Sequence, residues 1–247
     1  MTKIRKVLLF IICIILFTGC TATEKVSLTD DGKIKENVSV MEKNGNVLYG
    51  SSTLEESIEQ YLSEYEDALR VRKYSYDIKI KDEESGAVLT NTYDDMCSFI
   101  RKTSFSQYLY KKVNCAFKDG YYVVESSGEF FRKDSFEEPW KVPDKIILKI
   151  DLGVNLEENN ADSVNKTTYT WNFDTDTPSS KEIKFKVNKS KLDGEKERRI
   201  KEKQEAKTKK KIINVFILIF VIIILAVVSY FVYKVLKKKY ENNKIDY

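Results

Sequence analysis

VNCAFKDGYYVVE, residues 113–125, contains the strongest hairpin pattern in this sequence. Val113, Cys115 and Phe117 lead into the pair Asp119-Gly120, and the chain returns from Tyr121 onward. An Asp-Gly pair between two strand-like runs is a strong local signal for a tight turn that joins antiparallel strands. The stretch therefore predicts a β-hairpin in the middle of the chain.

The residues after this hairpin continue to resemble strands. Pro139 and Pro143 mark a loop, and alternating side chains then predict strands over 145–152, 167–173 and 181–187. Side chains two residues apart share one face of a strand. In the second of these strands that face is aromatic, and we expect it to be buried in the core; its residues are Tyr169, Trp171 and Phe173.

The residues before the hairpin mix strands with helices. A turn at 30–32 predicts a first hairpin, although the alternation in its second strand slips between Ile34 and Val38. A capping-box spacing and one apolar face predict a helix over 53–70. Strands are expected over 74–80 and 87–93, and Asp94 is expected to cap a short helix that runs through Ile100. Runs of strands with one or two inserted helices predict an α+β domain with a twisted antiparallel sheet, spanning 20–188.

Residues 1–19 have the layout of an export signal. A basic start precedes an apolar run over 7–17, which is too short to cross a bilayer of about 30 Å comfortably. The run ends in Phe17-Thr18-Gly19-Cys20, which resembles a bacterial lipobox except that Phe17 replaces the usual Leu. We therefore expect cleavage before Cys20 and lipidation of that residue. The alternative is an uncleaved anchor with an incidental cysteine.

A second apolar run, 212–233, has about 22 residues and is long enough to span a bilayer. Lysines flank both ends, so the sequence predicts a single transmembrane helix followed by a cytoplasmic tail, 234–247. The charged segment before it, 189–211, is as basic as the tail, which the positive-inside rule disfavours. Long exported domains follow the first signal, so we place the domain outside and the tail inside the plasma membrane.

The segment 189–211 has almost no apolar face. It contains three Glu-first pairs at i,i+4 spacing, which stabilise an isolated helix slightly; these are Glu195 with Arg199, Glu197 with Lys201, and Glu205 with Lys209. It is either a solvated helical stalk or a disordered linker.

Charge and residue types exclude several classes of function. Eleven of the 42 basic residues lie in the membrane flanks, which leaves the domain acidic and argues against a nucleic-acid partner. The chain has no histidine, which excludes histidine-dependent triads and histidine-ligated metal sites. An S-x-x-K match at Ser163–Lys166 lacks its companion motifs, and Asp174 and Asp176 lack the rest of a calcium loop. We expect no catalytic, cofactor or metal site.

Two cysteines, Cys97 and Cys115, lie in the expected outer domain. An exported domain permits a disulfide between them, and that bond would contribute roughly 3 kcal/mol by closing a loop of about 18 residues. Two buried thiols are the alternative.

Both ends of the domain resemble the LppM-like bacterial membrane lipoproteins. The resemblance rests on a lipobox followed by a strand–turn–strand, and on a strand, an Asn-rich turn and a Trp-bearing strand before the last helix. The segments are TEKVSLTDDGKIKENVSV (23–40), IILKIDLGVNLEENNADSVNKTTYTWNF (146–173) and EIKFKVNK (182–189). The middle, about 50–140, matches no motif of the family. The resemblance implies a membrane-tethered envelope domain.

The sequence thus favours a non-enzymatic envelope lipoprotein that acts by binding or assembly, with the membrane and an envelope protein or lipid as partners. One alternative is a lipid-binding or lipid-transfer module, which would need a continuous apolar cavity of some 300 Å³ or more between helix 53–70 and the sheet. A histidine-free enzyme is the other, and it would need buried carboxylates clustered in a cleft.

Overall fold

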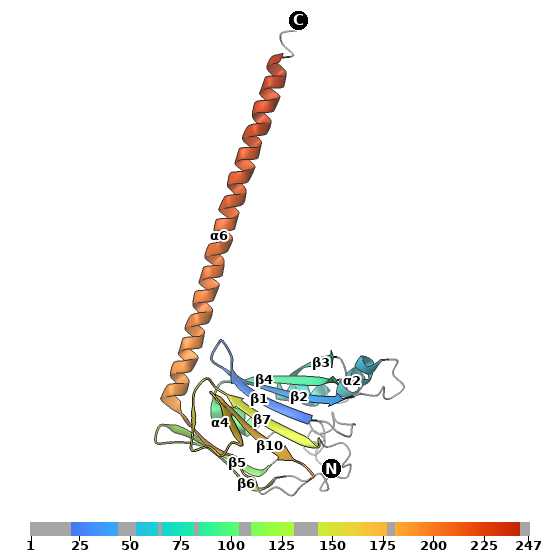
Figure 1. Cartoon of the computed structure of the whole chain (residues 1–247), viewed down its shortest axis with the longest axis vertical. Helices are drawn as coiled ribbons and strands as arrows, with labels where there is room; N and C mark the ends of the chain where they lie inside the picture. Colours follow the sequence, from blue (N-terminus) through green and yellow to red (C-terminus); the bar gives the residue numbers. More distant parts are fainter. Residues whose placement is uncertain are drawn as a thin grey trace. The chain divides into compact units, whose positions relative to one another are not determined.

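The computed structural model describes residues 21–43, 53–63, 66–81, 84–103, 110–130, 143–176 and 181–242 of the 247-residue chain (Figure 1). The chain divides into two compact units, Met1–Arg199 and Ile200–Tyr247. The described helices are α2 (Leu54–Ser63), α3 (Glu66–Arg72), α4 (Met96–Lys102) and α6 (Lys189–Asn242). The described strands are β1 (Thr21–Leu28), β2 (Ile34–Lys43), β3 (Ser75–Lys81), β4 (Glu84–Tyr93), β5 (Tyr110–Lys118), β6 (Tyr121–Phe130), β7 (Lys145–Asp151), β8 (Leu156–Glu157), β9 (Ser163–Asn165), β10 (Thr168–Asp174) and β11 (Lys184–Asn188).

The larger sheet has seven strands in the order β3-β4-β2-β1-β7-β10-β9. Its neighbouring strands are antiparallel, with the exception of β1 and β7, which pair in parallel from Thr21 opposite Lys145 to Ser27 opposite Asp151. The α+β class is confirmed, and the parallel pair is an addition to the expected antiparallel sheet. No hairpin joins β1 to β7, so the long intervening chain leaves either direction open to them.

A second, antiparallel sheet has the order β5-β6-β11-β8. The predicted hairpin at 113–125 is confirmed as β5 and β6. Asp119 and Gly120 have φ angles of 52° and 84°. Two successive positive φ angles are the requirement of the two-residue turn that matches strand twist, which is why Asp-Gly suits this position.

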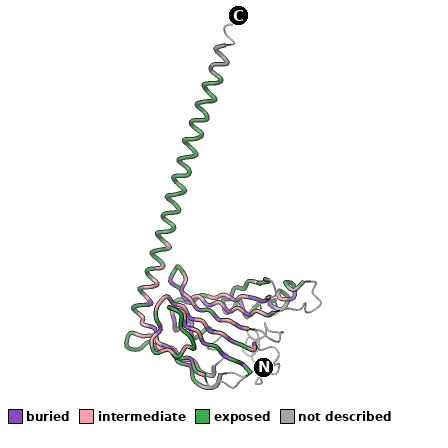
Figure 2. Tube along the Cα trace, viewed as in Figure 1, coloured by how far each residue is buried: buried purple, intermediate pink, exposed green. Residues whose placement is uncertain are grey.

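The core of the first unit lies between the two sheets. Buried residues alternate with more exposed ones along β1, β2, β7 and β10 of the larger sheet and along β11 of the second sheet (Figure 2). The expected aromatic face of β10 is buried as predicted, with Tyr169, Trp171 and Phe173 at most 4% exposed. The Trp171 ring lies 5.9 Å from the ring of Phe185 on β11, so a strand of the second sheet covers this face.

The helices near the sheets differ in detail from expectation. The helix expected over 53–70 corresponds to α2 and α3, which lie on either side of residues 64–65; those two residues are outside the described part. The capping residue of α4 is Asp95 rather than Asp94. Its carboxylate accepts the Ser98 backbone N–H at 2.8 Å, the usual N-cap bond three residues into a helix.

Helix α6 begins at Lys189, and its first turns, up to Arg199, are part of the first unit. Leu192 is fully buried, and Arg199 donates to the Leu28 carbonyl at 2.6 Å and to Glu195 at 2.8 Å. Hydrogen bonds from Arg198 and Arg199 lower the pKa of Glu195 to about 2, with the Arg198 bond the larger cause. The segment 189–211, for which a disordered linker was the alternative, is helical in the structure.

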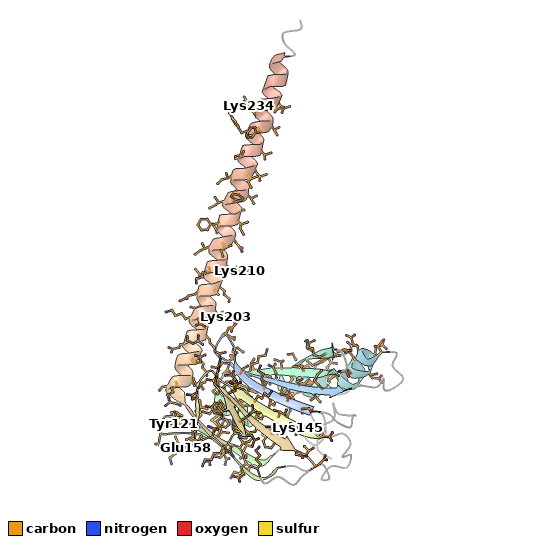
Figure 3. All side chains as sticks on the ribbon, in the orientation of Figure 1. Tyr121, Lys145, Glu158, Lys203, Lys210 and Lys234 are labelled. Atoms are coloured by element: carbon orange, nitrogen blue, oxygen red, sulfur yellow. A yellow bond between two sulfur atoms is a disulfide. The ribbon has the colours of Figure 1, made fainter. Side chains whose placement is uncertain are left out.

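The second unit consists, in its described part, of the remainder of α6. Its most apolar window of 18 residues has a mean hydropathy of 3.3, and its large apolar side chains are exposed on all sides. Figure 3 shows these side chains projecting around the helix between Lys210 and Lys234. By length and composition this helix can cross a membrane.

Candidate functional site: a buried carboxyl pair beside a polar groove

Two glutamates occupy inward positions on neighbouring strands of the larger sheet. Glu24 follows Ala22 and precedes Val26 on the buried face of β1, and Glu36 lies between Ile34 and Val38 on the buried face of β2. Glu24 is 4% exposed and Glu36 is fully buried. Carboxyl groups are almost never fully buried without partners, so this pair demands a local explanation.

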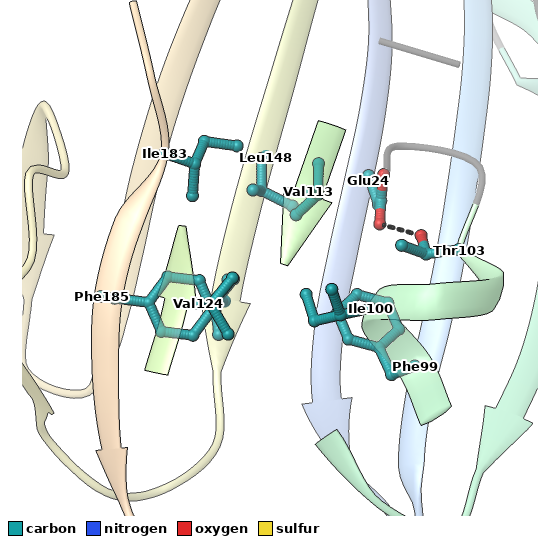
Figure 4. A pocket seen from close by; sticks show the side chains of 10 residues that line it. Glu24, Phe99, Ile100, Thr103, Val113, Val124, Leu148, Ile183 and Phe185 are labelled. Carbon is teal, nitrogen blue, oxygen red and sulfur yellow. Dashed lines mark hydrogen bonds between the residues drawn. The ribbon is translucent and has the colours of Figure 1, made fainter. Parts of the chain in front are cut away.

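The Thr103 hydroxyl lies between the two carboxyl groups. Its Oγ1 is 2.8 Å from Glu24 Oε1 and also forms a hydrogen bond with Glu36 Oε1. Figure 4 shows the contact with Glu24. Thr103 caps the C-terminus of α4, where its backbone N–H donates to the Phe99 carbonyl at 2.8 Å. The helix end thereby fixes the position of the hydroxyl.

Two tyrosines approach Glu36 from the other side. The hydroxyls of Tyr74 and Tyr93 both donate to Glu36 Oε2, Tyr74 at 2.6 Å. The Asn91 side-chain amide donates to the Tyr93 hydroxyl at 3.1 Å and to the Arg72 carbonyl at 2.9 Å. These bonds connect the buried pair to residues nearer the surface.

Burial dominates the electrostatics of this cluster. Burial, followed by the neighbouring Glu36 carboxyl, raises the pKa of Glu24 well above its usual range. The same two causes, again with burial first, raise the pKa of both Tyr74 and Tyr93. Both phenols therefore stay protonated at neutral pH and act as hydrogen-bond donors.

The space beside Glu24, between the two sheets, is small and apolar. Its volume is about 10 Å³, roughly what a single water needs. Figure 4 shows side chains of both sheets and of α4 closing around it, among them Leu148, Val124, Phe185 and Phe99. A space of this size is too small for an acyl chain.

A larger groove of about 420 Å³ opens at the surface beside Tyr93. Its walls come from the end of α3, the end of β4 and one side of α4, and they carry one carboxylate, that of Asp94, and three cationic side chains, those of Arg72, Lys73 and Lys102. Cations in the last turn of a helix also favour the helix dipole, which accounts for part of this pattern. The groove offers cations and amide and hydroxyl groups to an anionic or hydrogen-bonding ligand.

The residues singled out from the sequence do not meet at this site. Cys20 lies outside the described residues. Cys97 and Cys115 form a disulfide with a Cα–Cα distance of 5.2 Å, which joins the first turn of α4 to β5. Ser163 and Lys166 lie at the exposed edge of the larger sheet, where Lys166 has a φ angle of 54°.

The sequence contained a signal for the carboxyl pair. The slip in alternation between Ile34 and Val38 is the position of Glu36, which keeps the inward register and places a carboxyl where an apolar side chain was expected. Glu24 stands likewise two residues before Val26 on the inward face of β1. Nothing local to either strand indicates that Thr103, Tyr74 and Tyr93 complete the cluster.

No family model matches the sequence, and no curated protein matches it significantly. Among solved structures, the chain is similar to the NMR structure of the folded domain of LppM from Mycobacterium tuberculosis. The two share 10% sequence identity with a TM-score of 0.43, over 70% of this chain and 92% of that one.

Proposed function

We propose that this chain is a membrane-anchored envelope protein whose exported domain acts by binding a partner rather than by catalysis. The observation that carries the proposal is α6, a helix that begins in contact with the folded domain at Leu192 and continues into an apolar run long enough to span a bilayer. The Cys97–Cys115 disulfide supports the same conclusion, because such bonds persist in oxidising compartments outside the cytoplasm.

The accessibility of the candidate groups favours binding over catalysis. A catalytic carboxyl must touch its substrate, whereas Glu24 and Glu36 are closed off between the sheets. The groove beside Tyr93 is open to solvent and carries Arg72, Lys73 and Lys102. We therefore place the binding face at this groove, and its charge favours a partner with anionic groups.

Protease protection tests the topology. Protease added to intact spheroplasts is expected to digest the domain and to spare a tag placed after Tyr247, because α6 crosses the membrane once. Cys97 and Cys115 should not react with a thiol reagent until a reductant is added. Permeabilised spheroplasts, in which the tag must also disappear, are the control. A protected domain with a digested tag would reverse the proposed orientation.

Metabolic labelling with palmitate tests the second anchor. Because Cys20 follows a basic start, an apolar run and Gly19, the wild type should incorporate label and Cys20→Ala should lose it and remain as a full-length precursor. Cys13→Ala is the matched control, since that cysteine lies within the apolar run. Equal labelling of the wild type and Cys20→Ala would rule out a lipid at this position.

A further inference from the structure

The contacts of Thr103 require a proton on one of the two glutamates. A threonine hydroxyl has one hydrogen, so it can donate to only one carboxyl group. Its oxygen nevertheless lies within hydrogen-bonding distance of both Glu24 and Glu36. The second contact is a hydrogen bond only if that carboxyl donates to the hydroxyl oxygen, and a carboxyl donates only when it is protonated.

The other partners identify which glutamate holds this proton. Tyr74 and Tyr93 both direct their hydroxyl hydrogens at Glu36 Oε2, so Glu36 is the acceptor in both of these bonds. Glu24 has Thr103 and the Glu36 carboxyl as its polar partners, and it also borders the apolar side chains of the small space. The consistent arrangement runs from Glu24 O–H to Thr103 Oγ1, and from Thr103 O–H to Glu36.

We propose that Glu24, Thr103 and Glu36 form a proton-binding site in the core, in which Glu24 stays protonated at neutral pH. The proton is part of the folded structure: when the Glu24 O–H bond breaks and its proton passes to solvent water, two carboxylates face one hydroxyl. Thr103 can then satisfy only one of them, and the contact between the end of α4 and the larger sheet is weakened.

Groups from several described elements surround this site. Among the described residues, the titratable groups in contact within this site are Glu24 from β1, Glu36 from β2, Tyr93 from β4 and Tyr74 just before β3. The second sheet contributes apolar side chains to the space beside Glu24, those of Val113, Val124 and Phe185, and α4 contributes Phe99 and Ile100. The dominant charge effect on Glu24 is therefore repulsion from Glu36.

The direction of the pH effect follows from the folded state binding one proton more than the unfolded state. An unfolded glutamate has a pKa of about 4.3, and the pKa of the folded Glu24 lies well above that. The stabilisation is fully present below about pH 4.3 and is lost as the pH rises toward the folded pKa. Across that window one proton changes the folding constant by about tenfold per pH unit.

Glu24→Gln tests this directly, because glutamine mimics the neutral carboxyl and can still donate to Thr103. The full chain in detergent micelles is unfolded with denaturant at several pH values. The folding constant of the variant relative to the wild type should rise by about tenfold per pH unit above pH 5. Glu125→Gln is the control, because Glu125 is exposed and its Oε1 lies 3.4 Å from Lys184 Nζ at the surface. The folding constant of this control variant relative to the wild type should show no such trend. A ratio that stays constant from pH 5 to pH 8 would overturn the proposal.

Infrared spectroscopy gives a second readout that needs no variant to fold. At pH 7 the wild-type chain should retain the carbonyl absorption of a protonated carboxylic acid, which exposed glutamates and aspartates lose by ionisation. Glu24→Gln should remove this absorption and Glu125→Gln should keep it. Absence of the absorption in the wild type, or its persistence in Glu24→Gln, would refute the assignment of the proton to Glu24.

Discussion

Trp171→Ala is expected to destabilise the folded domain by about 3–5 kcal/mol, the usual cost of truncating a large buried aromatic side chain. Trp171 is fully buried and packs on Phe185 of the second sheet. Its Nε1–H donates to Asn160 Oδ1 at 2.9 Å, and the same oxygen accepts the Lys184 backbone N–H at 2.8 Å. The variant therefore loses packing between the sheets and the hydrogen bond from the indole to Asn160, while the bond from Lys184 to the same oxygen can remain. Typical domains have about 5–15 kcal/mol of stability in total, so the loss is severe.

Denaturant unfolding of the full chain in detergent measures this loss. Val164→Ala is the matched control, because Val164 is 53% exposed at the edge strand β9 and its truncation should change stability by less than about 0.5 kcal/mol. If Trp171→Ala unfolds at the same denaturant concentration as the wild type, the indole does not hold the two sheets together. Loss of binding without loss of stability would instead indicate a binding surface at this strand.

The features that local sequence predicts are the hairpins and the faces of strands. Period-two alternation identified the buried face that contains Trp171, because side-chain direction follows from strand geometry alone. Asp119-Gly120 identified the β5–β6 turn, because few residues adopt two successive positive φ angles without strain. Each of these inferences depends on residues that are neighbours in the sequence.

The arrangement of strands into two sheets was not predictable in the same way. The β1–β7 pair joins segments that are more than a hundred residues apart, and nothing in either strand specifies its neighbour. The same holds for the start of α6. The Glu195–Arg199 pair was predicted from helical spacing, whereas the bond from Arg199 to the Leu28 carbonyl depends on the folded domain.

The carboxyl pair shows why a buried polar site is hard to find in one sequence. A charged residue at an inward position of a strand reads as a break in the pattern, as Glu36 did. The burial of such a carboxyl group is stabilised by hydrogen-bond donors from elsewhere in the chain, here the hydroxyls of Tyr74, Tyr93 and Thr103. Position in the strand predicts that the side chain points inward, but only the tertiary structure provides its partners.

Removing the disulfide is expected to cost the domain about 3 kcal/mol, as estimated for a closed loop of about 18 residues. The helix α4 has only seven residues, too few to form a stable helix alone, and the double variant Cys97→Ala, Cys115→Ala removes its covalent link to β5. Its contribution to the folded state then rests on the burial of Met96, Phe99 and Ile100 between the sheets. The disulfide adds to this stability because it lowers the conformational entropy of the unfolded chain, in which the two joined segments cannot separate.

Denaturant unfolding of the oxidised wild type, the reduced wild type and the double variant separates the contributions. The reduced wild type and the double variant should both be less stable than the oxidised protein, by similar amounts, and reductant should have no further effect on the double variant. Truncating the Cys97 and Cys115 side chains costs little packing by comparison, because both are only partly buried. If the double variant is as stable as the oxidised protein, the burial of α4 alone fixes this part of the chain, and the bond between α4 and β5 contributes nothing to folding.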